Sequence, residues 1–191
     1  MAPAPGERPR VRLRELRPED EAEFLERARA SRRLHLPWAH VADTHERFDE
    51  LLAAGANPSE AMYLIVGVDD GAITGIARLS QIFIGNFRSA YLGYSAFVPH
   101  DGKGYMTEGL RLVLREAFGP IGLHRVAANV QPDNVRSIAL VERLGFCREG
   151  YSPRYLKIGG RWRDHLRYAI LAEDFLIAET ARRARSLRGR A

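Results

Sequence analysis

HDGKGYMTEGL, residues His100–Leu110, joins an apolar run to an amphipathic one and places two glycines at the junction. The apolar run AYLGYSAFV (Ala90–Val98) comes first, so the predicted order is strand, glycine loop, helix. Gly102 and Gly104 can take backbone angles that turn successive N–H groups to one side. A helix beginning near Tyr105 points its unpaired N–H groups and its positive dipole end at the same place. The stretch therefore predicts an anion site that suits phosphate.

A tight turn with good helix capping would produce the same pattern, and that alternative stays open at this point. Two common nucleotide motifs do not fit. A P-loop ends in Gly-Lys-Thr or Gly-Lys-Ser, which is absent here, and GxGxxG would need a glycine at Thr107. Spacing therefore excludes these two motifs.

Residues 101–106 resemble the acyl-CoA loop of the GNAT acetyltransferases, written QxxGxG or QxxGxA. Asp101 stands where Gln or Arg is usual, and Met106 stands where a small residue is usual. A second segment, NVRSIALVERLGF (residues 134–146), resembles the NxxAxxxYxxxGF segment of the same superfamily. There Ser137 takes the small-residue position, and Val141 stands where many members carry tyrosine.

Further segments resemble one subgroup, the RimJ/RimL type, which acetylates the N-termini of ribosomal proteins. These segments are HRVAANVQPDN, FCREGY and GGRWRDH. The resemblance covers roughly Arg12 to Phe175, and it is specific because separate segments agree in order. It implies an acetyl-CoA-dependent N-acetyltransferase with no metal.

The predicted fold class is α/β (α+β), with a mixed central sheet of about seven strands. The unit strand, helix, strand from Ala90 to Val130 predicts a splayed parallel pair, and Asp69-Asp70-Gly71 predicts a hairpin. With 191 residues and 46% hydrophobic content, one domain is expected. We place it at residues 11–176, between a flexible segment 1–10 and a basic tail 177–191, and the resemblance implies helices on both faces of its sheet. Other expected elements are a strand at 11–16, helices from 18, 44–55, 105–118 and 134–145, strands at 61–68, 72–83 and 124–130, and three strand segments at 147–158, 162–165 and 166–171.

Net charge and cysteine content limit the kinds of partner that this chain is expected to bind. The net charge of +5 equals the contribution of five tail arginines, so the remaining body is neutral and carries no DNA-binding footprint. The tail is expected to be a solvated or frayed helix end, with contact to ribosomal RNA as the alternative.

Cys147 is the single cysteine, and no metal-ligand pattern occurs. No signal peptide or membrane span is recognised, so a cytoplasmic location is expected. Monomer and homodimer both stay open.

The resemblance assigns the cofactor-binding positions. The main chain of residues 102–106, with Lys103, would hold the pyrophosphate of acetyl-CoA, and Phe97 and Val98 would pair with the pantetheine like an added strand. Asn134 would grip a pantetheine amide or cap its helix. Arg136 would meet phosphate or stay solvated. The full set is Phe97, Val98, Gly102, Lys103, Gly104, Tyr105, Met106, Asn134 and Arg136.

Amine attack on a thioester needs a neutral amine and a proton for the leaving thiolate. Ser137 is the candidate general acid, one turn before Val141, or it packs against the helix backbone. No carboxylate lies in Ala90–Val98, so the base is unassigned. An α-amine is neutral at pH 7 far more often than lysine, by about 3 kcal/mol, which favours a protein N-terminus over lysine. The resemblance implies that this N-terminus begins with Ala or Ser and belongs to a ribosomal or other cytoplasmic protein. Alternatives are a small amine (antibiotic, polyamine, amino acid) or a non-catalytic acetyl-CoA sensor. The candidate acceptor-binding residues are His35, Trp38, Tyr155, Trp162 and Asp164.

Overall fold

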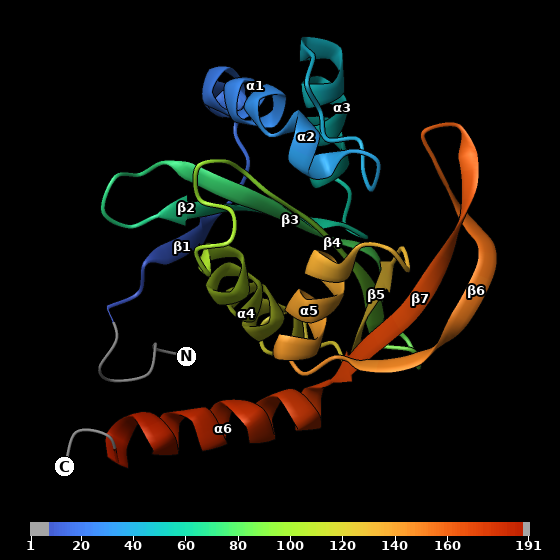
Figure 1. Ribbon diagram of the computed structural model, residues 1–191. Coiled ribbons are helices and arrows are strands. Elements are labelled where there is room, and N and C mark those ends of the chain that lie inside the picture. Colours follow the sequence, from blue (N-terminus) through green and yellow to red (C-terminus); the bar gives the residue numbers. More distant parts are fainter. Residues whose placement is uncertain (1–7, 189–191) are drawn as a thin grey trace.

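The computed structural model describes residues 8–188 as one seven-stranded sheet flanked by helices (Figure 1). The strand order is β1-β2-β3-β4-β5-β7-β6, and every neighbouring pair is antiparallel except β4 and β5. The predicted mixed sheet with one parallel pair is thus confirmed. The strands are β1 (Val11–Arg14), β2 (Ala61–Gly67), β3 (Ile73–Phe83), β4 (Ser89–Ala96), β5 (Arg125–Val130), β6 (Cys147–Ile158) and β7 (Arg161–Leu171).

Helices cover both faces of the sheet, as expected, with α1 to α3 on one face and α4 and α5 on the other (Figure 1). The α4 stripe that includes Leu110, Val113 and Leu114 is fully buried against the sheet. On the opposite face, the Phe24 ring lies 5.4 Å from the rings of both Phe48 and Phe97. The helices are η1 (Pro18–Asp20, a 3-10 turn), α1 (Glu21–Ala30), α2 (Arg32–His35), α3 (His45–Gly55), α4 (Tyr105–Phe118), α5 (Val135–Arg143) and α6 (Ala172–Arg188).

The parallel pair opens soon after it begins. The ladder between β4 and β5 holds only from Ser89 to Tyr91, whereas β4 stays paired with β3 as far as Ala96. Just beyond β4, Phe97 N–H donates to the Thr74 carbonyl on the β3 side. Because main-chain groups alternate in direction along a strand, those of Tyr94 and Ala96 point into the gap beside β5. The gap therefore has, along one side, a strand edge that β5 does not pair.

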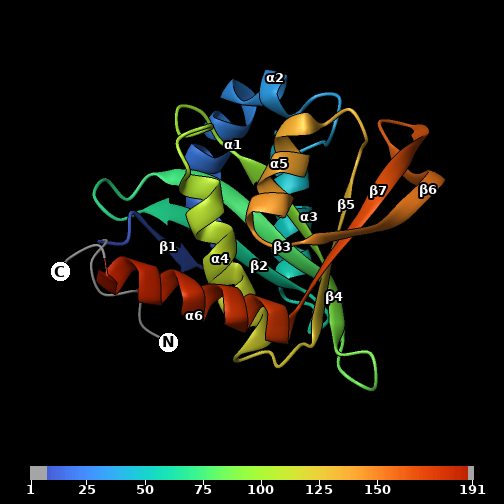
Figure 2. The same ribbon diagram turned by 60° about the horizontal axis from the view of Figure 1, so that its bottom comes forward.

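The last helix differs only in part from the predicted solvated or frayed helix end, because its first half is docked while Ala184 and Arg185 are exposed. Helix α6 runs to Arg188 and crosses α4 (Figure 2). Phe175 packs 5.5 Å from the Phe118 ring, and the buried Glu179 carboxylate pairs with the Arg115 guanidinium of α4. The boundary placed after 176 thus falls inside a docked helix. Of the predicted segments, residues 1–7 and the tail residue Arg190 lie outside the described part of the chain.

Two long strands replace the three segments predicted after residue 146. The division between 165 and 166 was wrong because no turn residue separates WRDH from LRYAIL, which form one continuous β7. Gly159 and Gly160, with φ of +57° and +78°, make the turn between β6 and β7. This hairpin curves away from the rest of the sheet (Figure 1). Within residues 8–188, no helix has the length and apolarity needed to cross a membrane.

Candidate active site

A cavity of about 1300 Å³ occupies the gap between β4 and β5. At one end it is bounded by the glycine loop and the first turns of α4 and α5, which we call the donor end. At the other it is bounded by β5, β7, α2 and the loop after α2, which we call the acceptor end. The splayed strands thus connect two chemically different regions through one space.

The donor end is built for an anion. Gly102 and Gly104 have φ of +71° and +87°, and Gly104 is the N-cap residue of α4, so the loop turns directly into the helix N-terminus. The cationic side chains around the cavity outnumber the two carboxylates, Asp101 and Glu108. Those cations are Arg8, Arg10, Lys103, Arg111, Arg136, Arg143 and Arg182.

The positive charge at this end is only partly neutralised. Arg10 pairs with Glu108 at 3.0 Å, and Arg136 lies 3.5 Å from Asp101. Burial lowers the pKa of Arg111, and the neighbouring Arg182 of α6 lowers it further by repulsion. A bound phosphate would relieve that repulsion, since opposite charge favours the charged form of a guanidinium. Part of the basic segment predicted to be a solvated tail therefore faces this cavity.

The predicted main-chain pairing through Phe97 and Val98 is not available. Phe97 N–H donates to Thr74, its carbonyl accepts from His100 N–H at 3.0 Å, and Val98 N–H donates to Ser31 Oγ at 2.9 Å. The Phe97 side chain is also completely buried in the core. The cavity is lined instead by the residues just before Phe97, residues 92–96. Sequence matching missed this because it cannot tell which alternate residues face the gap.

Asn134 caps α5, because its Oδ1 accepts from Ser137 N–H at 3.2 Å, and it also lines the cavity. The capping alternative is therefore seen directly, while a grip on a ligand amide stays a prediction.

Tyr105 begins α4, and the Arg10 guanidinium lies over its ring, 5.1 Å from the ring centroid. Met106 lines the donor end beside the loop.

Ser137 has a partner that the sequence did not suggest. Its hydroxyl lies 2.5 Å from the Tyr94 hydroxyl of β4, and both residues line the cavity. Burial raises the pKa of Tyr94 to about 12, so the phenol stays protonated. Val141 is fully buried in the core and does not line the cavity. The hydroxyl pair thus joins β4 to the first turn of α5, one turn before Val141.

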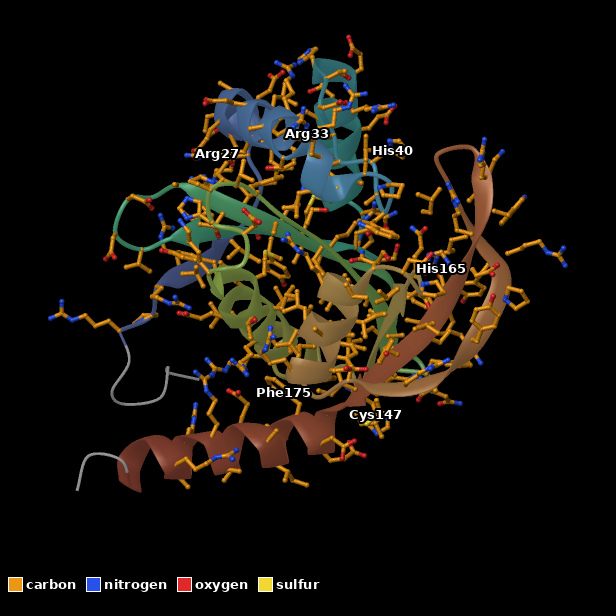
Figure 3. The ribbon with its side chains drawn as sticks, viewed as in Figure 1. Arg27, Arg33, His40, Cys147, His165 and Phe175 are labelled. Carbon is orange, nitrogen blue, oxygen red and sulfur yellow. The ribbon has the colours of Figure 1, made fainter. Side chains whose placement is uncertain are left out.

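His165 of β7 is the second residue that the sequence did not single out. Its side chain is 3% exposed and lines the acceptor end (Figure 3). Nδ1–H donates to the Arg163 carbonyl at 3.0 Å, which leaves Nε2 able to accept a proton. Burial lowers the pKa of His165 below its ordinary value, so the ring is neutral at pH 7. The local sequence does not distinguish it from Asp164, although neighbouring residues on a strand face opposite ways.

Asp164 and Trp162 do not reach the cavity. The Asp164 carboxylate accepts from the Tyr151 hydroxyl and from Arg154 N–H at 2.7 Å, which lowers the pKa of Asp164. The structural pairing favoured for Asp164 is present, with these partners in place of an arginine side chain. Trp162 is 61% exposed near the hairpin tip. Neither residue is positioned to meet a substrate in the cavity.

His35 and Trp38 do line the acceptor end. His35 Nε2–H donates to the Ala96 carbonyl at 2.7 Å, and burial lowers the pKa of His35. The Trp38 carbonyl accepts from Gln131 Nε2 at 2.9 Å. Two residues along, His40 lies against Gly159 at the hairpin tip, where an added Cβ would come within 3.0 Å of Nε2. The loop after α2 therefore bridges to both β5 and the hairpin.

Comparisons with known proteins agree with this architecture. A family model described as an acetyltransferase (GNAT) domain matches residues 10–147. YjcK of Bacillus subtilis (strain 168), named as an N-acetyltransferase, is 41% identical over 134 residues, 70% of this chain and 74% of YjcK. The ribosomal protein uS5-alanine N-acetyltransferase of Escherichia coli (strain K12) is 42% identical over 107 residues, 56% of this chain and 55% of that protein. Mycobacterium smegmatis RimJ in complex with CoA-disulfide has a TM-score of 0.76 at 30% identity, covering 85% of this chain and 82% of that chain.

Proposed function

The chain belongs to the GNAT acetyltransferase family and is an N-acetyltransferase, and from that premise we propose that it acetylates the N-terminal α-amine of a protein. Acceptors beginning with Ala or Ser, on a ribosomal or other cytoplasmic protein, are expected, with acetyl-CoA as the donor. The E. coli relative, named for the alanine of uS5, supports this choice of acceptor. The M. smegmatis structure with a CoA compound supports the choice of donor.

One observation carries the proposal: a single cavity connects the cationic glycine loop with the neutral His165 ring and the hydroxyl pair of Tyr94 and Ser137. The N–H groups at the start of α4 would hold the pyrophosphate, and the cations around them would hold the remaining phosphate charge. The edge of β4 that β5 leaves unpaired, at Tyr94 and the N–H of Ala96, would pair with the pantetheine amides in place of Phe97 and Val98, while the Ala96 carbonyl accepts from His35. These residues support acetyl-CoA as the donor at its phosphate groups and its pantetheine arm.

Acetyl transfer forms a bond between the amine nitrogen and the thioester carbon and breaks the bond between that carbon and sulfur. In the proposed mechanism, His165 Nε2 takes a proton from the amine, because the ring is neutral and its other nitrogen is held by Arg163. Tyr94 donates to Ser137, whose own O–H is then directed to the leaving sulfur and supplies its proton. Proton removal and proton supply thus come from opposite sides of the gap, from His165 on β7 beyond β5 and from Tyr94 and Ser137 on β4 and α5.

Charge at the acceptor end argues against a polyamine. Among the described residues that line the cavity, the only carboxylates are Asp101 and Glu108, both at the donor end. A polycation would leave water without a compensating negative charge, which is costly. An N-terminal α-amine brings one charge and loses it readily near neutral pH. The neutral acceptor end therefore favours the single amine.

The test is thiol release from acetyl-CoA with four acceptors: an Ala-starting peptide, a Ser-starting peptide, an N-acetylated peptide with one lysine, and spermidine. Turnover on the first two and at least tenfold less on the others is expected. Turnover on spermidine alone would overturn the choice of acceptor. Binding of acetyl-CoA without turnover on any amine would favour a sensor.

A further inference from the structure

A second cavity of about 400 Å³ lies on the sheet face opposite α4 and α5. Its floor comes from the residues of β5 that alternate with the buried Val126 and Ala128, namely Arg125, Ala127 and Asn129. Its walls come from β3, β4 and the β6–β7 hairpin. Helices α1 to α3 cover the same face of the sheet but pack mainly over β2 and β3, so this part of the face is open (Figure 1).

The two cavities adjoin. Asn129 lines both of them, and the Tyr155 ring of the second cavity lies 6.1 Å from the His165 ring of the first. Arg167 is paired in register with Asn129 and follows His165 by two residues, so both β7 side chains lie on one face. Two residues of extended chain span about 7 Å. A polypeptide whose first nitrogen lies at His165 would therefore reach Arg167 within its first few residues.

The path from His165 in the other direction, away from Arg167, is blocked. His40 lies against Gly159, and the Trp38 carbonyl is bonded to Gln131, so the loop after α2 and the hairpin tip meet beyond His165. A small acceptor would need no exit, whereas a polypeptide needs a path away from the reacting amine. That path leads toward the second cavity.

The second cavity also has an unbalanced charge. Arg125 is ion-paired with Glu149, whose pKa is lowered by that contact and, to a smaller extent, by the charge of Arg167, so one carboxylate stands against two guanidinium groups. Arg167 lies over Gly150, where an added Cβ would come within 2.6 Å of its Nη2. Within residues 8–188, Arg167 makes no ion pair. One positive charge is therefore left for a ligand.

Aromatic rings surround that charge. Phe83 and Phe87, exposed by 63% and 74%, form an edge-to-face pair 6.0 Å apart at the rim. Tyr91 and Tyr155 stand on the inner side, where hydrogen bonding to Tyr91 raises the pKa of Tyr155. Rings and one cation suit a peptide segment that carries an acidic side chain among apolar groups.

We propose that this second cavity, the Arg167 subsite, binds the residues that follow the acetylated residue of the acceptor, with an acidic side chain of that segment paired with Arg167. The proposal rests on the proposed function, because it takes the acceptor to be a polypeptide. It makes the enzyme selective for sequence beyond the first residue. Tyr155, predicted as an acceptor-binding residue, becomes the wall between the reacting amine and this subsite.

The test uses six-residue peptides that begin with Ala and carry a single Glu, Gln or Lys at position 2, 3 or 4. In the wild type, KM is expected to be severalfold lower for Glu than for Gln at one of these positions, as for a partly exposed ion pair. Arg167→Glu should reverse the preference to Lys at that position, and Arg167→Gln should abolish it. The kcat values should change little, because Arg167 does not contact the reacting atoms.

The matched control is Arg148→Glu. Arg148 is exposed on the same hairpin and does not line the second cavity. It is paired in register with Tyr168, whose hydroxyl donates to Glu142 of α5 at 2.9 Å, so its side chain faces the α5 side. This variant should keep the wild-type preference. Equal KM for Glu, Gln and Lys at all three positions would overturn the subsite while leaving the acceptor class intact. Turnover on spermidine but on no peptide would overturn the proposed function itself. Unchanged acetyl-CoA binding by the variants verifies their folding.

Discussion

The donor and acceptor ends of the cavity are built in different ways. The donor end depends on the main chain, since Gly102 and Gly104 set the loop angles and the start of α4 supplies N–H groups. The acceptor end depends on side chains such as His165 and Trp38, which the topology brings together from β7 and the loop after α2. A main-chain site needs a few glycines in a fixed local order, whereas a side-chain site can be assembled from distant segments. The difference explains why the donor loop was recognisable from the sequence, whereas the acceptor end was predicted only in part, with His35 and Trp38 but without His165.

The largest expected effect is at the acceptor end. Replacing His165 by Gln keeps a polar side chain of similar size but removes the proton acceptor, so kcat for an Ala-starting peptide should fall about 100-fold or more. The dissociation constant for acetyl-CoA, measured by calorimetry, should not change, because His165 does not contact the donor end. The two ends would then be functionally separable.

A control for this variant is His124→Gln, which alters an exposed histidine paired with Glu173 at 3.2 Å on the far side of the molecule. It should retain wild-type kcat. If His165→Gln turned over peptide within threefold of wild type, His165 would not be the base, and the amine would be deprotonated by solvent.

Variants of the hydroxyl pair, which lies between the donor and acceptor ends, test the proposed supply of a proton to the leaving sulfur. Tyr94→Phe and Ser137→Ala should each lower kcat about tenfold, because either change interrupts proton supply to the leaving sulfur. The double variant should be hardly worse than either single one, since groups that act as a unit are not additive. Steady-state kinetics at saturating acetyl-CoA measures all three. Strictly additive losses would mean that the two hydroxyls act separately.

At the donor end, Gly104→Ala should weaken acetyl-CoA binding about tenfold. A φ of +87° costs a residue with a Cβ about 1 to 2 kcal/mol, so the loop would shift away from the angles that present its N–H groups. Calorimetric titration with acetyl-CoA measures the change. The kcat at saturating donor should stay near wild type.

Gly71→Ala is the matched control, because Gly71 has φ of +70° in the hairpin between β2 and β3, with no atom within 4 Å of an added Cβ. It carries the same backbone cost far from the cavity and should leave acetyl-CoA binding unchanged. Equal weakening by both variants would show that stability alone, and not the loop, determines donor binding.

The sequence predicted the structure best where that structure depends on residues that are neighbours in the chain. The strand, glycine loop and helix around His100–Leu110, the stripe on α4 and the hairpin at Asp69-Asp70-Gly71 all depend on neighbours in the chain. Tyr94 and Ser137 are 43 residues apart and meet only because β4 and α5 flank the same gap. The main-chain direction at Phe97 and the docking of Glu179 likewise depend on partners that no local pattern names. Family resemblance supplied the fold and the donor but could not supply these contacts.

The smallest expected effect is on the stability of the fold at acidic pH, where a buried histidine and an exposed histidine are expected to act in opposite directions. Burial lowers the pKa of His165 and His35, so the unfolded chain binds their protons first as pH falls through about 6.5. Their contribution to stability is therefore complete above that pH and is lost below it. His45 has the opposite sign, because Glu21 raises its pKa and protonation favours the folded state. Between pH 7 and pH 5, His165→Gln should reduce the fall in melting temperature by a few degrees at most, and His45→Gln should steepen it. Identical melting profiles for the two variants would contradict the assignment of His165 as a buried, neutral base.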